Sequence, residues 1–231
     1  MVATPPCGQR GWGEDFDVFF DPTKVNVVNQ AIGGRSSRTF RTEGRWDAVL
    51  AMLKAGDYVI IELGHNDGGP INDTSRARGT IKGTGDEAKE IDNMLTGKHE
   101  TVRSYGWYLR QYVAETKAKG ATPILMSLVP RNSWKDGKVT RARPNGYAAW
   151  AQEVAENSQT FFVDHHEISA RGLEQIGPEK AKELFTDGLH ASPEGAKFNA
   201  RAALSGLKAL RGNPLGQWLS EEGKSVGALK P

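Results

Sequence analysis

An aspartate and a histidine three residues apart are the first pair in this chain that could do chemistry. They are Asp187 and His190, in the segment Asp187-Gly188-Leu189-His190. A carboxylate that accepts a hydrogen bond from one imidazole nitrogen fixes the tautomer of the ring, and the other nitrogen can then take a proton from a hydroxyl. The same spacing also fits a surface turn before a helix, so the pair alone leaves both interpretations open.

Two further segments could stabilise the negative oxygen that develops when a hydroxyl attacks an ester. Asn66 lies in Gly64-His65-Asn66-Asp67, and a neutral amide donates to an oxyanion without titrating. Gly34 ends the segment 29–34, where glycines allow a backbone N–H to be exposed toward an anion. The structural alternatives are a polar turn that caps a strand for Asn66 and a strand-to-helix turn for Gly34.

Alternating strands and helices are expected to position these residues. Runs of apolar and β-branched residues predict strands, and runs that are apolar on both faces indicate a sheet covered on both sides. Amphipathic patterns between the strands predict helices, and this alternation favours a parallel, layered α/β sheet. The predicted strands are 25–32, 57–63, 122–129 and 161–164, and the predicted helices are 46–54, 104–119, 147–156 and 193–210, the last capped by Ser192.

Two stretches, 64–101 and 131–144, interrupt the alternation and are predicted to be loops. Both follow the C-terminal ends of strands, where ligands bind in open α/β sheets. Trp134 lies in the second stretch, and its aromatic face makes it a candidate ligand contact. The arginines at positions 35, 38, 41 and 45 flank Gly34, and most are expected to be solvated.

The composition excludes several classes of protein. The 30 Lys and Arg residues against 28 Asp and Glu give a net charge of +2, which is too balanced for a nucleic-acid binder that depends on a basic field. No apolar run approaches the ~18–20 residues that a membrane span needs. The length fits a single domain over residues 1–231, with a core over 11–211 and a C-terminal tail over 212–231.

Cysteine and histidine usage argues against a metal site. The single cysteine, Cys7, excludes an internal disulfide and a cysteine-based metal cluster. His165 and His166 are expected on an extended segment, where adjacent side chains point to opposite faces and do not share one ion. No basic-then-apolar leader follows Met1, and both a cytoplasmic and a secreted or periplasmic location stay open.

Taken together, the chemical segments resemble the SGNH (GDSL-type) hydrolase family. Gly34, Gly64-His65-Asn66-Asp67 and Asp187-Gly188-Leu189-His190 are similar to three conserved blocks of that family, in the same order. Gly11-Trp12-Gly13-Glu14, the segment 29–36 and the run 56–69 are most similar to the rhamnogalacturonan acetylesterase branch of the carbohydrate esterases. The resemblance covers residues 1–211 and implies a three-layer α/β/α fold with a mostly parallel, flavodoxin-like sheet.

The resemblance also implies a function. In that family a serine attacks an ester, His190 would act as general base and then acid, and Asp187 would orient it. The Gly34 N–H and the Asn66 side chain would form the oxyanion hole, and the four residues are expected to converge at the C-terminal edge of the sheet. The expected substrate is an acetylated pectic polysaccharide such as rhamnogalacturonan, and no metal or organic cofactor is implied. With such a substrate, Trp134 could stack on a sugar ring, and one or two of the arginines at 35, 38, 41 and 45 could bind the carboxylates of an acidic sugar polymer. The candidate substrate contacts are His65, Arg35 and Trp134.

One block of the family is missing from this sequence. The nucleophile of such enzymes is the serine of an N-terminal Gly-Asp-Ser block that follows the first strand, and no Gly-Asp-Ser occurs here. We expect that serine just before Met1, together with a central first strand whose absence leaves its neighbours unpaired. The 231-residue chain as written is therefore expected to show only a trace of esterase turnover.

No residue in the sequence fits the role of nucleophile as well as the serine expected upstream. Cys7 follows two prolines in an expected loop, with only Arg10 nearby to activate its thiol. Ser36 and Ser37 are better explained by helix capping, and Ser127 lies in a predicted strand and is expected in the core. The sequence also has no Gly-x-Ser-x-Gly elbow, which disfavours an α/β-hydrolase.

Two alternative functions stay open at this stage. One is a carbohydrate-binding relative that has lost its serine and is not catalytic. The other is a lipase or thioesterase on the same scaffold, which the polar composition of 64–101 disfavours. The oligomeric state cannot be derived from the sequence.

Overall fold

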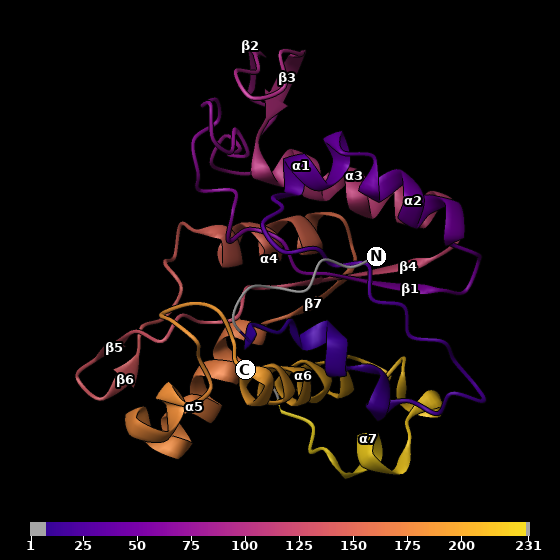
Figure 1. Ribbon diagram of the computed structural model, residues 1–231. Helices are drawn as coiled ribbons and strands as arrows, with labels where there is room; N and C mark the ends of the chain where they lie inside the picture. The colour runs from indigo at the N-terminus through magenta and orange to yellow at the C-terminus, as the bar shows by residue number, and fades with distance from the viewer. Residues whose placement is uncertain (1–7, 230–231) are drawn as a thin grey trace. The chain divides into compact units, whose positions relative to one another are not determined.

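The computed structural model describes residues 8–229, which form two units built from separate segments (Figure 1). The sheet unit comprises residues 34–128 and 143–162, and the helix unit comprises residues 8–33, 129–142 and 163–229. The expectation of a single domain over 1–231 stays a prediction.

A short parallel sheet organises the fold. Its strands are β1 (Tyr58–Ile61), β4 (Thr122–Met126) and β7 (Phe161–Val163), in the order β1-β4-β7. β1 and β4 run parallel, with Tyr58 opposite Thr122 and Ile61 opposite Leu125. Parallel neighbours need a crossover connection, and α3 lies between β1 and β4 in the chain. Three of the four predicted strands are confirmed, and the molecule is an α/β protein with flanking helices, as the fold class requires.

Four helices belong to the sheet unit, and α1, α2 and α3 lie together on one side of β1 and β4 (Figure 1). Ser104 caps α3 by accepting a hydrogen bond from the Trp107 N–H at 3.0 Å. The core beneath these helices includes Trp46, Leu109 and Tyr112. The helices are α1 (Ser37–Thr42), α2 (Arg45–Met52), α3 (Tyr105–Ala118) and α4 (Tyr147–Asn157).

In the helix unit, α5 (His165–Lys182) packs closely on α6 (Pro193–Lys208). A Cβ at Gly172 would lie 2.7 Å from the Phe198 ring, so glycine is required for this approach. Ser192 caps α6 as expected, accepting from the Gly195 N–H at 3.2 Å. The remaining short helices are η2 (Trp12–Asp15), η3 (Asp17–Phe19), η4 (Gly216–Trp218) and α7 (Glu221–Ser225).

Residues 25–32 do not form the predicted strand. The segment has no strand partner within residues 8–229, and most of it is exposed, including Val28. The Asn29 side chain instead accepts a hydrogen bond from the Ala31 N–H at 3.0 Å. β-branched residues favour a strand only where a neighbouring strand covers them, so the local pattern alone was insufficient.

The two predicted loops contain strands of their own. Residues 64–101 include β2 (Ala88–Asp92) and the start of β3 (His99–Arg103), which pair antiparallel. Residues 131–144 contain the short hairpin of β5 (Trp134–Lys135) and β6 (Lys138–Val139). Trp134 therefore lies on a strand and not in an irregular loop.

The histidine pair also differs from expectation. Asp164 is the N-cap of α5, accepting from the Glu167 N–H at 3.1 Å, so His165 and His166 begin a helix. His165 is fully buried, and its Nε2 contacts the Asn199 carbonyl oxygen at 2.9 Å. Within residues 8–229 no three His, Cys, Asp or Glu side chains are grouped to hold a metal ion. No helix in the same residues is long and apolar enough to cross a bilayer.

Candidate active site

The turn between α5 and α6 holds Asp187 and His190 in contact. The Asp187 Oδ2 lies 2.7 Å from the His190 Nδ1. The Asp187 Oδ1 accepts hydrogen bonds from the backbone N–H groups of Leu189 and His190, both at 2.7 Å. The carboxylate is thus fixed to the backbone of the residue that it orients, and the expected pairing of the two side chains is present.

These hydrogen bonds determine the charge and the tautomer. The His190 backbone N–H, the His190 ring and the Leu189 N–H lower the pKa of Asp187 to about 2, so its carboxyl is ionised at neutral pH. An ionised carboxylate can only accept a hydrogen bond, so the proton of the neutral imidazole lies on Nδ1 and is donated to Asp187. Nε2, which has no hydrogen-bond partner within residues 8–229, then has a lone pair for a substrate or nucleophile proton.

The β5–β6 segment supports this turn from within the same unit. The Asn132 N–H donates to the Gly188 carbonyl at 3.0 Å, and the Trp134 Nε1 donates to the Asn132 Oδ1 at 2.8 Å. Trp134 is only partly buried and packs beside Val139 and Leu173. Trp134 is therefore linked to the Asp187–His190 turn through Asn132. Its role in stacking on a sugar stays a prediction.

In the sheet unit, Gly34 and Asn66 lie next to each other. The Asn66 Nδ2 donates to the Arg35 carbonyl at 2.9 Å, which leaves the second hydrogen of the amide for another acceptor. Gly34 has φ +82°, a conformation that favours glycine. Its N–H has no acceptor within residues 8–229, as an oxyanion donor requires. Asn66 follows Gly64, whose φ is +146° and whose Cβ position lies 3.1 Å from the Leu128 side chain.

Asp67 anchors the turn that carries Asn66. It is fully buried and accepts from the Ser37 N–H, the Ser37 hydroxyl and the Thr80 hydroxyl. Burial raises the pKa of Asp67 to about 6, although each of these hydrogen bonds acts in the opposite direction. The first turn of α1 is thereby joined to the Asn66 turn. This role of Asp67 has no local signal in the sequence, because its partners are 30 and 13 residues away.

Four arginines were candidates for binding a sugar carboxylate, and each has an acidic partner in the protein. Arg35 and Arg45 both contact Glu43, at 2.9 and 2.6 Å. Arg41 forms a bidentate pair with Glu115. The expectation that most of these side chains are solvated is wrong for Arg38, which is 1% exposed.

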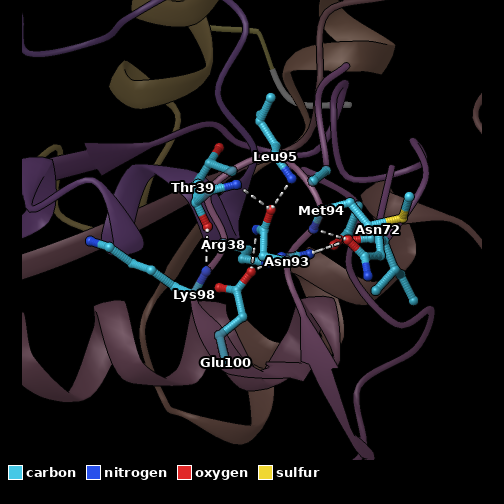
Figure 2. Close-up of polar contacts among 12 residues, drawn as sticks. Arg38, Thr39, Asn72, Asn93, Met94, Leu95, Lys98 and Glu100 are labelled. Carbon is cyan, nitrogen blue, oxygen red and sulfur yellow. Dashed lines mark hydrogen bonds and ion pairs between the residues drawn. The ribbon is translucent and has the colours of Figure 1, made fainter. Parts of the chain in front are cut away.

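Arg38 is the centre of a buried polar network (Figure 2). It donates to the carbonyl oxygens of Ile71 and Gly79, at 2.7 and 2.9 Å, and pairs with Glu100. Glu100 also accepts from the Asn93 Nδ2 at 2.6 Å. This network fixes the segment 71–79 against α1 and β3.

Arg78 lies in that fixed segment and was missed by the sequence analysis. Its Nη1 donates to the Gly34 carbonyl at 2.8 Å. Its Nε is buried and has no hydrogen-bond partner within residues 8–229. The sequence does show that Arg78 lies in a polar segment after the Asn66 turn, but many other residues of that segment share this property.

The other candidates are placed as follows. His65 lies in the Asn66 turn and is partly buried. Ser36 caps α1 by accepting from the Thr39 N–H at 3.1 Å, as expected. Ser37 donates to Asp67, and Ser127 is buried one residue after β4. Cys7 lies outside the described residues.

The structure thus brings Asp187 to His190 within the helix unit and Gly34 to Asn66 within the sheet unit. The roles of these four residues stay predictions.

Comparison with known proteins adds the family context. The model of the GDSL-like Lipase/Acylhydrolase family matches residues 4–198. The rhamnogalacturonan acetylesterase of Emericella nidulans is 35% identical over 207 residues, which cover 89% of this chain and 81% of that protein. The probable rhamnogalacturonan acetylesterase YesY of Bacillus subtilis is 30% identical over 220 residues, covering 93% of this chain and 90% of YesY.

A solved structure agrees with this similarity. The crystal structure of YxiM from Bacillus subtilis matches with a TM-score of 0.70 and 29% identity. The match covers 87% of this chain and 50% of the YxiM chain, so this chain spans about half of that protein.

Proposed function

Because the chain belongs to the GDSL-like lipase/acylhydrolase family, we propose that it is an esterase that removes acetyl groups from a pectic polysaccharide such as rhamnogalacturonan. The observation that carries the proposal is the Asp187–His190 pair, with its 2.7 Å side-chain contact and its two backbone anchors. The names of two relatives that are at least 30% identical over most of their length support the substrate.

The proposed reaction begins with attack of a serine hydroxyl on the acetyl carbonyl carbon. The hydroxyl proton passes to the His190 Nε2, and the carbonyl oxygen becomes an oxyanion that the Gly34 N–H and the Asn66 amide stabilise. When the tetrahedral intermediate collapses, the sugar oxygen leaves with the proton from His190 and the acetyl group stays on the serine. Water then attacks the acetyl carbonyl with His190 as base, and acetate leaves as His190 gives the proton back to the serine oxygen.

The nucleophile is the one component that the sequence does not supply. No Gly-Asp-Ser occurs in residues 1–231, and we expect this block upstream of Met1. The geometry of Asp187 and His190 does not depend on that block, because every hydrogen bond described for the pair is formed within residues 184–192 or with Asn132.

We propose that the site for the acyl group is small and polar and does not bind a long lipid chain. Residues 64–101 are rich in polar side chains, and Asn66, Asp67 and Arg78 all belong to this stretch. We therefore expect acetyl esters to be cleaved faster than long-chain esters of the same alcohol.

The experiment compares acetate release from acetylated rhamnogalacturonan oligosaccharides with hydrolysis of acetyl and decanoyl esters of p-nitrophenol. The enzyme is the chain extended upstream to include a Gly-Asp-Ser block. Acetate release with a preference for the acetyl ester supports the proposal. Faster cleavage of the decanoyl ester would favour a lipase or thioesterase, and oligosaccharide binding without hydrolysis would favour a non-catalytic carbohydrate-binding protein.

A further inference from the structure

Arg78 is a cation that has no acidic partner among residues 8–229. Of its five N–H donors, one bonds to the Gly34 carbonyl, and the residue takes part in no ion pair within residues 8–229. Its Nε is buried without an acceptor. This contrasts with Arg35, Arg38 and Arg41, which each have a carboxylate partner.

The surroundings of Arg78 make an added anion favourable. Partial burial lowers the pKa of Arg78, and the positive charges of Arg76 and Arg35 act in the same direction. The carboxylates of Asp67 and Asp73 raise the pKa of Arg78, but both already accept hydrogen bonds from other groups. Asp67 binds Ser37 and Thr80, and Asp73 binds the N–H groups of three residues in its own turn.

The position of Arg78 links this unpaired cation to the proposed reaction. Its contact with the Gly34 carbonyl places the guanidinium beside the residue whose N–H is the proposed oxyanion donor. The segment that carries it is fixed by Arg38, which bonds to the carbonyl of the adjacent Gly79 at 2.9 Å. A substrate whose acetyl group reaches Gly34 would therefore bring its neighbouring sugar groups close to Arg78.

We propose that Arg78 binds the carboxylate of a uronic acid residue in the substrate and so selects acidic over neutral acetylated polysaccharides. A guanidinium binds a carboxylate through two parallel N–H groups, and Nη2 together with the second hydrogen of Nη1 provides such a pair. This inference rests on the proposed function, because it assigns Arg78 to the substrate side of the same site.

The first test measures binding and does not require turnover. The probe is a deacetylated galacturonate–rhamnose oligosaccharide, titrated into the 231-residue chain by calorimetry. Arg78→Gln should weaken binding about 10- to 100-fold, as loss of a hydrogen bond to a charged group does. Arg76→Gln is the matched control, because Arg76 is an exposed arginine in the same segment, and it should change the affinity less than twofold. The same probe with its carboxylates reduced to alcohols should bind both forms of residue 78 equally.

The second test uses acetate release by the upstream-extended chain. Arg78→Gln should raise KM for the uronate-containing substrate about 10- to 100-fold more than KM for the same substrate with its carboxylates reduced to alcohols. An equal loss of kcat on both substrates would overturn the inference, because it would mean that Arg78 only positions Gly34. Unchanged binding of the uronate probe by Arg78→Gln would also overturn it.

Failure of the proposed function gives a different result. In that case the wild-type extended chain releases no acetate from either substrate, whereas the calorimetric comparison of Arg78→Gln with Arg76→Gln still decides whether residue 78 binds the carboxylate.

Discussion

Replacing Arg38 by methionine should be among the most destabilising single changes in the sheet unit. Arg38 is 1% exposed, and methionine keeps an unbranched apolar stem but has no charge and no N–H donors. The change removes two hydrogen bonds to carbonyl oxygens and leaves Glu100 without its cationic partner.

The magnitude follows from burial. Removing one partner of a buried ion pair costs about 3–5 kcal/mol, because the other charge stays desolvated. For a chain of this length, that loss corresponds to a fall in Tm of roughly 6–20 °C. The exposed pair of Arg45 and Glu43, with side chains 32% and 36% exposed, gives the matched control: Arg45→Met should cost less than about 1 kcal/mol.

Urea unfolding followed by circular dichroism measures both variants. A double variant, Arg38→Met with Glu100→Leu, should recover part of the loss, because it removes the uncompensated charge. If Arg38→Met costs no more than Arg45→Met, the buried network does not stabilise the segment 71–79 and the positioning of Arg78 needs another explanation.

Three further outcomes are expected. The folded Asp67 carboxyl keeps its proton up to about pH 6, whereas the unfolded one ionises near 3.8, so the free energy of unfolding should fall by about 2 kcal/mol as the pH rises from 4 to 6; Asp67→Asn should lack this slope in urea unfolding at the two pH values. The Asp187 carboxyl should titrate near pH 2 by NMR, and a midpoint above 4 would contradict its anchoring. Asn66→Ala should lower kcat for acetate release about 10²-fold or more with little change in KM, and an effect on KM alone would remove it from the oxyanion hole.

The parts of the fold that the sequence predicted are those with local signals. β1 and β4 are short apolar runs, of which β4 is mostly buried and β1 partly buried. Helix α6 begins after the Ser192 cap that its sequence indicates. Helix α5 was missed although its start carries a signal, an aspartate at position 164 that caps the Glu167 N–H.

The elements that sequence reasoning misplaced depend on distant partners. The segment 25–32 has the composition of a strand but no strand beside it within residues 8–229. The β2–β3 hairpin shows the reverse, because its two strands are polar and bury only Ile91 and Val102. Pairing between the strands, and not their apolar content, determines this hairpin.

The contacts in the candidate site are also of two kinds, local ones and ones between residues far apart in the sequence. The Asp187–His190 contact could be predicted because both partners lie within one turn. The contacts of Asp67 with Ser37, and of Arg78 with Gly34, join residues 30 and 44 positions apart. No spacing in the sequence encodes such contacts, so these two residues became visible only in the structure.

Acetate release from acetylated rhamnogalacturonan oligosaccharides, measured for the upstream-extended chain and for its His190→Ala variant, decides whether His190 is the catalytic base. We expect release by the extended chain, a loss on the order of 10³-fold or more in kcat for His190→Ala, and only a trace of release by the 231-residue chain. Equal rates for the extended chain and a folded His190→Ala variant would contradict the assignment of His190 as the catalytic base.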